Sequence, residues 1–260
     1  MATPWSEESK RRLTAVGSVG AGILAWELYA SRTQSLFVPH VLDVAAAFLD
    51  QLGSSEFWTA YRETLLPFLL GWTSAIAVGV LVGLLVGLSP AARSIVAPYF
   101  TFFNSVPLAT FLPVLVIAFG IGLGSRTLVV FLFAVVDVFF TTASGVAYVD
   151  RDLLVMSRSF GLGRARRFRR IVVPGALPSI VSAVRLGTGR AVLGMVVMEL
   201  LLVSVGVGRL VGVYRDTFRS PELYALLASL AVFGLTLLVL VRRLERLVHR
   251  GRPTAYGVNS

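Results

Sequence analysis

Three long stretches of this chain contain no charged residue, and they constrain its fold more than any other feature. No charge lies between Glu63 and Arg93, between Arg93 and Arg126, or between Glu222 and Arg242. A helix that crosses a bilayer needs about 20 mostly apolar residues, and each stretch is long enough to supply one. Only 15% of the 260 residues are charged, whereas soluble domains carry about 25%. The sequence therefore predicts an integral membrane protein.

Three further apolar segments carry one or two internal charges, and they raise the predicted number of membrane spans to six. By residue number the predicted spans are 13–30, 64–88, 95–120, 127–149, 186–208 and 223–241. Because lipid offers no hydrogen bonds to the backbone, we expect an all-α fold. The expected organisation is a tail (1–12), a first membrane anchor helix (13–31), a core of five spans (62–242) and a second tail (243–260). The first span is too long for an ordinary signal-peptide core, so we expect it to be retained.

The basic residues predict the orientation of the chain in the membrane. The net charge is +10, and most positive charges fall within residues 10–12, 151–170 and 242–252. Positive residues collect on the cytoplasmic side, and six spans place these three clusters on one side, so we expect both termini to be cytoplasmic. One loop disagrees, because Arg209, Arg215 and Arg219 then lie outside. We expect these three arginines to be solvated or to reach lipid headgroups.

Small residues recur at every fourth position of the second predicted span. They are Gly71, Ala75, Gly79, Gly83 and Gly87. In lipid the hydrophobic effect does little to join helices, so close backbone approach along small residues favours association. The stripe predicts a buried, closely packed helix.

The third predicted span is interrupted by Pro98, Pro107 and Pro113, with Asn104 and Ser105 just before the middle proline. Proline removes a helix hydrogen bond, and freed backbone groups cannot face lipid. Transporters place such broken helices along substrate pathways, although a structural kink without a ligand is an equal alternative. Asn104, Ser105 and Pro107 are therefore candidate pathway residues.

Four charged residues fall inside predicted spans: Glu27, Asp137, Arg190 and Glu199. Charges in lipid are costly, so we expect them to face the protein interior or a pathway. Arg190 and Glu199 are nine residues apart on one span, which is too far for a helical ion pair. Their partners are expected on another helix or another subunit, and both are pathway candidates. For Asp137 and Glu27 we expect a position near the membrane interface.

The segment after the fourth span, residues 150–174, has the pattern of two short helices. Asp150 or Asp152 can cap the first helix, and Gly161 is placed to end it, because glycine tolerates the left-handed conformation at a helix end. The apolar face of this helix consists of Leu153, Met156 and Phe160.

The second short helix is surrounded by arginines. Ala165, Phe168 and Ile171 recur at three-residue spacing, and Pro174 is expected to stop the helix. Anionic headgroups would attract the arginines, but they do not account for the glycine and proline positions. A basic loop of about 30 residues, held to the bilayer at both ends, is a poor platform for nucleic acid. We interpret the segment as a docking element for another protein.

Residues that would support catalysis or cofactor binding are missing from the sequence. Without cysteine, neither a disulfide nor a thiolate metal site can form, and His40 and His249 are far apart. The only lysine, Lys10, follows Ser9, so the Gly-Lys pair of a Walker A nucleotide site is absent. We expect no enzyme activity and no cofactor or metal in this chain.

Residues 149–201, VDRDLLVMSRSFGLGRARRFRRIVVPGALPSIVSAVRLGTGRAVLGMVVMELL, resemble the cytoplasmic-loop region of ABC-importer permeases, in particular the nitrate, sulfonate and taurine branch. The family signature is an EAA triplet, three residues, glycine, nine residues, isoleucine, one residue, leucine and proline. Gly161, Ile171 and Pro174 match this spacing, with Val173 in place of leucine. SVPLATFLPVLVIAFGIG, residues 105–122, resembles the third span of the same branch. The resemblance covers about residues 64–241.

One departure from the signature lies in the EAA triplet, which falls on Val155, Met156 and Ser157. In the family, the glutamate of the triplet helps to hold the coupling loop against the ATPase. Its absence implies that docking here depends more on apolar packing and on the arginines.

The resemblance implies a six-helix permease with a cytoplasmic coupling loop in the inner membrane of a prokaryote. The implied partners are two copies of a separate ABC ATPase that holds ATP and Mg, a second and identical permease subunit, an extracytoplasmic binding protein and membrane lipid. Closure of the ATPases would pull the loops together and open a pathway for a small anionic solute. A stand-alone secondary transporter or channel, or a membrane-anchored interaction protein, is the alternative. The residues that the resemblance assigns to the coupling loop are Asp152, Leu153, Phe160, Gly161, Arg166, Phe168, Ile171 and Pro174.

Overall fold

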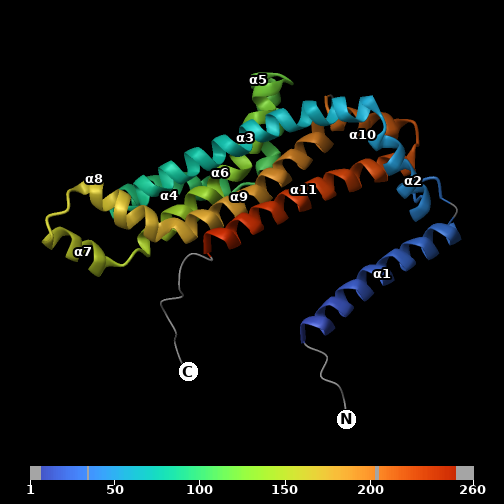
Figure 1. The fold of residues 1–260 in the computed structure, drawn as a ribbon. Helices are drawn as coiled ribbons and strands as arrows, with labels where there is room; N and C mark the ends of the chain where they lie inside the picture. Colours follow the sequence, from blue (N-terminus) through green and yellow to red (C-terminus); the bar gives the residue numbers. More distant parts are fainter. Residues whose placement is uncertain (1–6, 34, 203–204, 250–260) are drawn as a thin grey trace, which may run out of the picture.

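The computed structural model describes residues 7–33, 35–202 and 205–249, and the regular elements in these ranges are all helical (Figure 1). A 3₁₀ turn (Leu108–Phe111) and a π-helical turn (Phe168–Val172) interrupt the α-helices. The α-helices are α1 (Glu7–Thr33), α2 (Val41–Leu52), α3 (Ser55–Gly87), α4 (Pro90–Ser105), α5 (Leu112–Phe119), α6 (Leu123–Ala147), α7 (Arg151–Ser159), α8 (Arg164–Arg167), α9 (Val173–Leu202), α10 (Val207–Asp216) and α11 (Ser220–His249).

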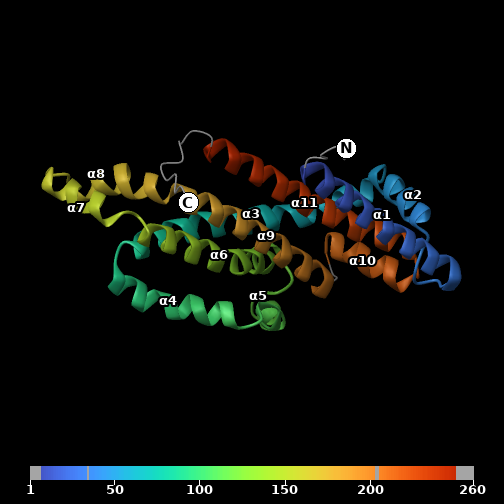
Figure 2. The same ribbon diagram turned by 90° about the horizontal axis from the view of Figure 1, so that it is seen from below.

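The long helices confirm the predicted fold class. Among the described residues, five helices are long and apolar enough to cross a membrane, and the number is six when the bent pair α4 and α5 counts as one span. The central helices α3, α6 and α9 lie side by side, with α11 along them (Figure 2). The bundle is therefore built around three long helices.

The small-residue stripe of α3 packs directly on α6, as predicted. A Cβ atom on Gly71 would lie 2.6 Å from the Thr127 carbonyl oxygen, and one on Gly87 would lie 2.6 Å from the Val146 Cβ. Ala75 between them is fully buried. The two backbones approach this closely because side chains are missing from the contact face.

The third span is broken, as the prolines predicted. Its two halves, Pro90–Ser105 and Leu108–Phe119, meet at an angle of 85°. Pro98 lies inside α4, whereas Pro107 stands at the break and precedes the 3₁₀ turn. Pro107 is thus the proline that separates the two halves, and its ring restricts the backbone where α4 ends.

The predicted stop at Pro174 is wrong. The helix continues from Arg164 through Pro174 to Leu201 as one segment of 38 residues. A π-helical turn lies just before the proline, from Phe168 to Val172. The wider turn changes the local hydrogen-bond pattern, so the missing proline N–H and its ring are accommodated inside a helix. The coupling loop is therefore connected rigidly to the fifth span.

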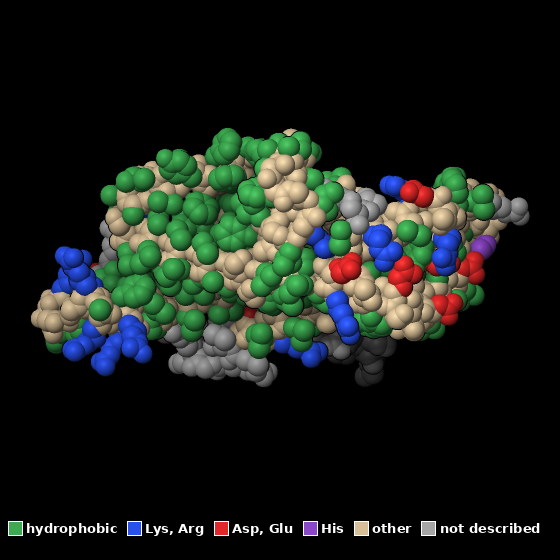
Figure 3. Space-filling model, turned by 90° about the horizontal axis from the view of Figure 1, so that it is seen from above, with side chains coloured by type: hydrophobic (Ala, Val, Ile, Leu, Met, Phe, Trp, Pro, Cys, Tyr) green, Lys and Arg blue, Asp and Glu red, His purple; other side chains and the backbone are tan. Residues whose placement is uncertain are grey.

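Charged side chains gather at the two ends of the molecule. In Figure 3 apolar side chains cover the middle, Lys and Arg side chains gather at the end that carries α7 and α8, and mixed charges gather at the end that carries α2 and α10. An apolar belt between two charged ends is the surface that a bilayer-spanning protein presents to lipid.

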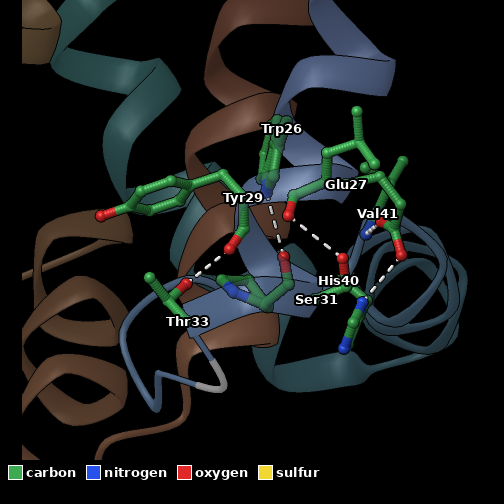
Figure 4. A network of polar contacts seen from close by, with 9 residues as sticks. Trp26, Glu27, Tyr29, Ser31, Thr33, His40 and Val41 are labelled. Atoms are coloured by element: carbon green, nitrogen blue, oxygen red, sulfur yellow. Dashed lines mark hydrogen bonds and ion pairs between the residues drawn. The ribbon is translucent and has the colours of Figure 1, made fainter.

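Helix α1 lies apart from the bundle along most of its length (Figure 1). Its last turns are held to the start of α2 by the contacts drawn in Figure 4. The Trp26 indole N–H donates to the Pro39 carbonyl oxygen (3.0 Å), and Glu27 accepts the Val41 N–H (3.0 Å) and lies 2.7 Å from His40 Nδ1. Glu27 therefore lies toward the end of α1, where it joins the next helix.

Candidate functional site

A cavity of about 380 Å³ lies at the break between α4 and the 3₁₀ turn. The break contributes Asn104, Ser105 and Pro107, α6 contributes Asp137, and α9 contributes Arg190. Phenylalanines 103 and 133 form part of its apolar wall. The structure thus brings together four of the five residues that the sequence suggested for a pathway, although they come from separate helices.

The charged part of the cavity is an ion pair. Arg190 Nε donates to Asp137 Oδ2 at 2.6 Å, and the two side chains are 51% and 24% exposed. The pair confirms that the partner of Arg190 lies on another helix. A guanidinium has five N–H donors, and within the described ranges Arg190 uses one of them, so the others can bind a solute in the cavity.

The sequence suggested a position near the membrane interface for Asp137, but the structure places it away from both ends of its helix. It stands near the middle of α6 (Leu123–Ala147) and is held there by Arg190. A carboxylate is tolerated at such depth when a positive partner and a cavity compensate for its lost hydration. Asp137 therefore joins the candidate site, and its position within an otherwise uncharged span was the available signal.

Two uncharged polar residues complete the cavity at the end of α4. Ser105 Oγ donates to the Thr101 carbonyl oxygen (2.9 Å), so its hydrogen is occupied within the helix. The Asn104 side chain is exposed and has no hydrogen-bond partner in the described part of the chain. Its amide can both donate to and accept from a polar solute.

Glu199, the fifth candidate, lies elsewhere. It forms a buried ion pair with Arg126 at 2.6 Å, and its second oxygen accepts the Gly208 N–H at 2.6 Å. Nearby, the N–H of Gly206 donates to Glu63 (2.9 Å). These contacts anchor the start of α10 on the bundle, so Glu199 has a positioning role away from the cavity. The sequence did not suggest Arg126 as an ion-pair partner, because this residue stands at the boundary of an apolar stretch and outside the predicted spans.

The glycine corner of the predicted coupling loop is present. Asp150 caps α7, since its Oδ1 accepts the Asp152 N–H at 2.8 Å. Gly161 has φ +69° at the other end, where its N–H donates to the Arg158 oxygen and the Leu162 N–H donates to the Ser157 oxygen. This pair of bonds is the Schellman arrangement, which requires a left-handed residue. We call α7, this corner and α8 the coupling arm (residues 151–167).

The coupling arm projects beyond the long helices (Figure 1) and presents an apolar face. Leu153, Met156 and Phe160 are 50%, 54% and 77% exposed. At its base, Phe168 and Ile171 pack against a buried cluster that includes Val149 and Val172. The tip is therefore free for a partner, whereas the base is held by the bundle, and Arg166 is exposed between them.

The arginines of the loop 206–221 are exposed but each is paired with a carboxylate. Arg209 lies 3.0 Å from Glu56, Arg215 lies 2.9 Å from Asp216, and Arg219 lies 2.7 Å from Glu222. The hydrogen bonds to Glu222 raise the pKa of Arg219 above its ordinary value. The excess positive charge that conflicted with the predicted orientation is therefore largely neutralised at this end.

The known proteins that this chain resembles are permeases of binding-protein-dependent transport systems. The family model for the binding-protein-dependent transport system inner membrane component matches residues 75–252. The chain is 28% identical over 250 residues to the taurine transport system permease protein TauC of Escherichia coli, covering 93% of this chain and 91% of that protein. It is 31% identical to the riboflavin transport system permease protein RibX of Chloroflexus aurantiacus, covering 83% and 81%.

Solved structures show the same fold. A crystal structure of an amino acid ABC transporter with histidines aligns with a TM-score of 0.54 at 17% identity, covering 80% of this chain and 95% of that chain. An inward-facing structure of the MetNI methionine ABC transporter aligns with the same TM-score and identity, covering 75% and 94%.

Proposed function

Because the chain belongs to the family of binding-protein-dependent transport system inner membrane components, we propose that the cavity at the α4 break is its translocation pathway. The family assignment makes the chain a transmembrane subunit of an ABC importer and decides against a stand-alone transporter. The observation that supports the pathway is the meeting of Asn104, Ser105, Asp137 and Arg190 at one cavity inside the spans. Polar groups at this depth are costly unless they serve a solute or one another.

We propose partners of the kind that the family description suggests. Two copies of a separate ABC ATPase hold ATP and Mg, each gripping one coupling arm, and this chain binds no nucleotide, metal or nucleic acid. A second, identical copy of the chain completes the pathway, and an extracytoplasmic binding protein delivers the solute. The exposed apolar face of Leu153, Met156 and Phe160 supports the docking of an ATPase, because exposed apolar patches mark interaction sites.

The continuous helix from Arg164 to Leu201 supplies the mechanical connection. At 1.5 Å per residue, Arg190 lies about 35 Å along this helix from Arg167, the last residue of the arm. An ATPase that moves the coupling arm therefore moves Arg190 as part of the same element. Movement of Arg190 relative to Asp137 on α6 would open and close the cavity.

The substrate class we propose is a small organic anion of the sulfonate type. Arg190 lines the cavity, and guanidinium groups bind such anions with charge-assisted hydrogen bonds. Relatives carry the names of taurine and aliphatic sulfonate transport permeases.

The protein is a multi-pass protein of the inner membrane. We place both termini and the coupling arm in the cytoplasm of a prokaryote, because basic side chains gather at the end with the arm (Figure 3) and the described arginines of the arm form no ion pair. The end with α2 and α10 then faces outward, where the binding protein docks.

The pathway assignment is tested by uptake of labelled sulfonates in a strain that lacks the gene and is complemented with variants. Loss of a hydrogen bond to a charged group costs about 1.5–3 kcal/mol, so Arg190→Gln should lower uptake by about 10- to 100-fold. Because that variant leaves Asp137 unpaired, the double variant R190Q/D137N serves as the matched control for folding. It should reach wild-type levels in the membrane but remain inactive. Normal uptake by the double variant would contradict the assignment.

A further inference from the structure

A second cavity, of about 420 Å³, lies where the coupling arm joins the bundle. The end of α3 and the first turn of α4 form one wall, and the end of α6 forms another. The coupling arm closes it with Leu154, Val155 and Arg158. A ligand in this cavity would therefore touch both the arm and the membrane-spanning helices.

Of the described residues that line this cavity, two are charged, and both are arginines. Arg93 Nη2 donates to the Gly87 carbonyl oxygen (3.1 Å), while its Nε is buried without a hydrogen-bond partner. Within the described ranges, neither Arg93 nor Arg158 forms an ion pair with a carboxylate. Two unneutralised guanidinium groups at one cavity favour an anion.

Val155 increases this imbalance of charge. It occupies the position at which the permease signature has a glutamate, and it lines the cavity beside Arg158. Asp150 and Asp152 are the acidic residues of the same segment, but neither lines the cavity. Asp150 is engaged in capping α7. The cavity therefore has positive groups and no carboxylate of its own.

The rest of the wall is apolar. Leu88, Pro90, Val146, Val149 and Val172 line it, and they lie where α3 leaves the apolar belt and α4 enters it. This is the end of the molecule at which basic side chains gather (Figure 3). Anionic lipid headgroups are enriched on the cytoplasmic face of a membrane, so the orientation proposed above, on which this inference rests, brings them to this end of the molecule, with their acyl chains toward the belt.

We propose that this cavity binds an anionic phospholipid, with its phosphate on Arg93 and Arg158 and its acyl chains along the apolar wall. Arginine pairs with phosphate in bidentate geometry, which suits a cavity with two guanidinium groups. A free phosphate ion would use the arginines but leave the apolar wall without a contact. The bound lipid fixes the coupling arm to the bundle and supplies the negative charge that the cavity lining lacks.

The test measures how much phosphatidylglycerol the purified full-length chain retains after washing with detergent, by lipid extraction and mass spectrometry. The double variant R93Q/R158Q should retain at least fivefold less than the wild type. R242Q/R243Q removes the same charge from exposed positions of α11 and should retain the wild-type amount. Equal retention by the wild type and R93Q/R158Q would overturn the proposal.

A second variant changes the cavity without removing an arginine. Val155→Glu supplies a carboxylate to the arginines and should release the lipid, whereas Val155→Gln, of similar size, should retain it. Undiminished retention by V155E would contradict the proposal. Thermal stabilisation of the delipidated chain by inorganic phosphate, equal to that by phosphatidylglycerol, would show a simple anion site and overturn the lipid assignment.

Discussion

At the scale of single residues, the Arg126–Glu199 pair joins three helices. Arg126 belongs to α6, Glu199 to α9, and the Gly208 N–H that Glu199 accepts belongs to α10. The two side chains are only 8% and 4% exposed. A buried pair is neutral as a unit, but removal of one member leaves an uncompensated charge in a medium that solvates it poorly.

We therefore expect Glu199→Gln and Arg126→Gln each to destabilise the protein by about 3–5 kcal/mol. The double variant R126Q/E199Q should recover part of this loss, because no charge is left unpaired. Thermal unfolding in detergent, followed for all four proteins, measures the coupling. Additive losses in the double variant would show that the pair is not coupled.

The sequence allowed part of this arrangement to be predicted. Helical spacing excluded a pair between Arg190 and Glu199, so partners on other helices followed directly. Which helices supply them depends on how far each is rotated and shifted against its neighbours. A single sequence does not determine these rotations and shifts. Asp137 was therefore identified as the partner of Arg190, and Arg126 as the partner of Glu199, only in the structure.

At the scale of elements, local patterns predicted packing and corners but not the course of the helix through Pro174. The stripe beginning at Gly71 and the corner at Gly161 depend on neighbouring residues, and both are present. The continuation through Pro174 depends on a π-helical turn, which tertiary packing of Phe168 and Ile171 stabilises. Propensity alone favours a stop there.

The corner at Gly161 gives a prediction for the coupling arm. A Cβ atom at this position would meet no neighbour within 4 Å, so only the backbone conformation restricts the residue. Gly161→Val should strain the left-handed turn by about 1–2 kcal/mol. That strain corresponds to a factor of about 5–30, by which we expect uptake per ATP hydrolysed to fall.

Reconstituted transport with simultaneous measurement of ATP hydrolysis checks this result. Gly161→Asn is the matched control, because asparagine tolerates the left-handed region, and it should stay close to wild type. If the valine variant transports normally, the corner does not position the arm.

At the scale of the whole molecule, the two charged ends differ in kind. At the end with α7 and α8, exposed arginines outnumber the acidic residues Asp150 and Asp152 and form no ion pair within the described ranges, whereas at the other end Arg209, Arg215 and Arg219 are balanced by carboxylates (Figure 3). Counting residues along the sequence left the loop 206–221 in conflict with the positive-inside rule. Arg215 and Arg219 pair with carboxylates within three residues along the chain, but Arg209 pairs with Glu56, 153 residues away, which only the folded chain brings close.

This asymmetry predicts the orientation of the protein, and the absence of cysteine makes the test clean, because no native thiol reacts. Ser159→Cys places a thiol on the coupling arm, and Thr217→Cys places one beyond α10; both positions are exposed. In intact spheroplasts, a membrane-impermeant maleimide should label T217C fully and S159C only after the membrane is opened. The physical reason is that the arginine-rich end is retained on the cytoplasmic side during insertion. Labelling of S159C from outside would reverse the orientation and, with it, the side from which an ATPase reaches the arm.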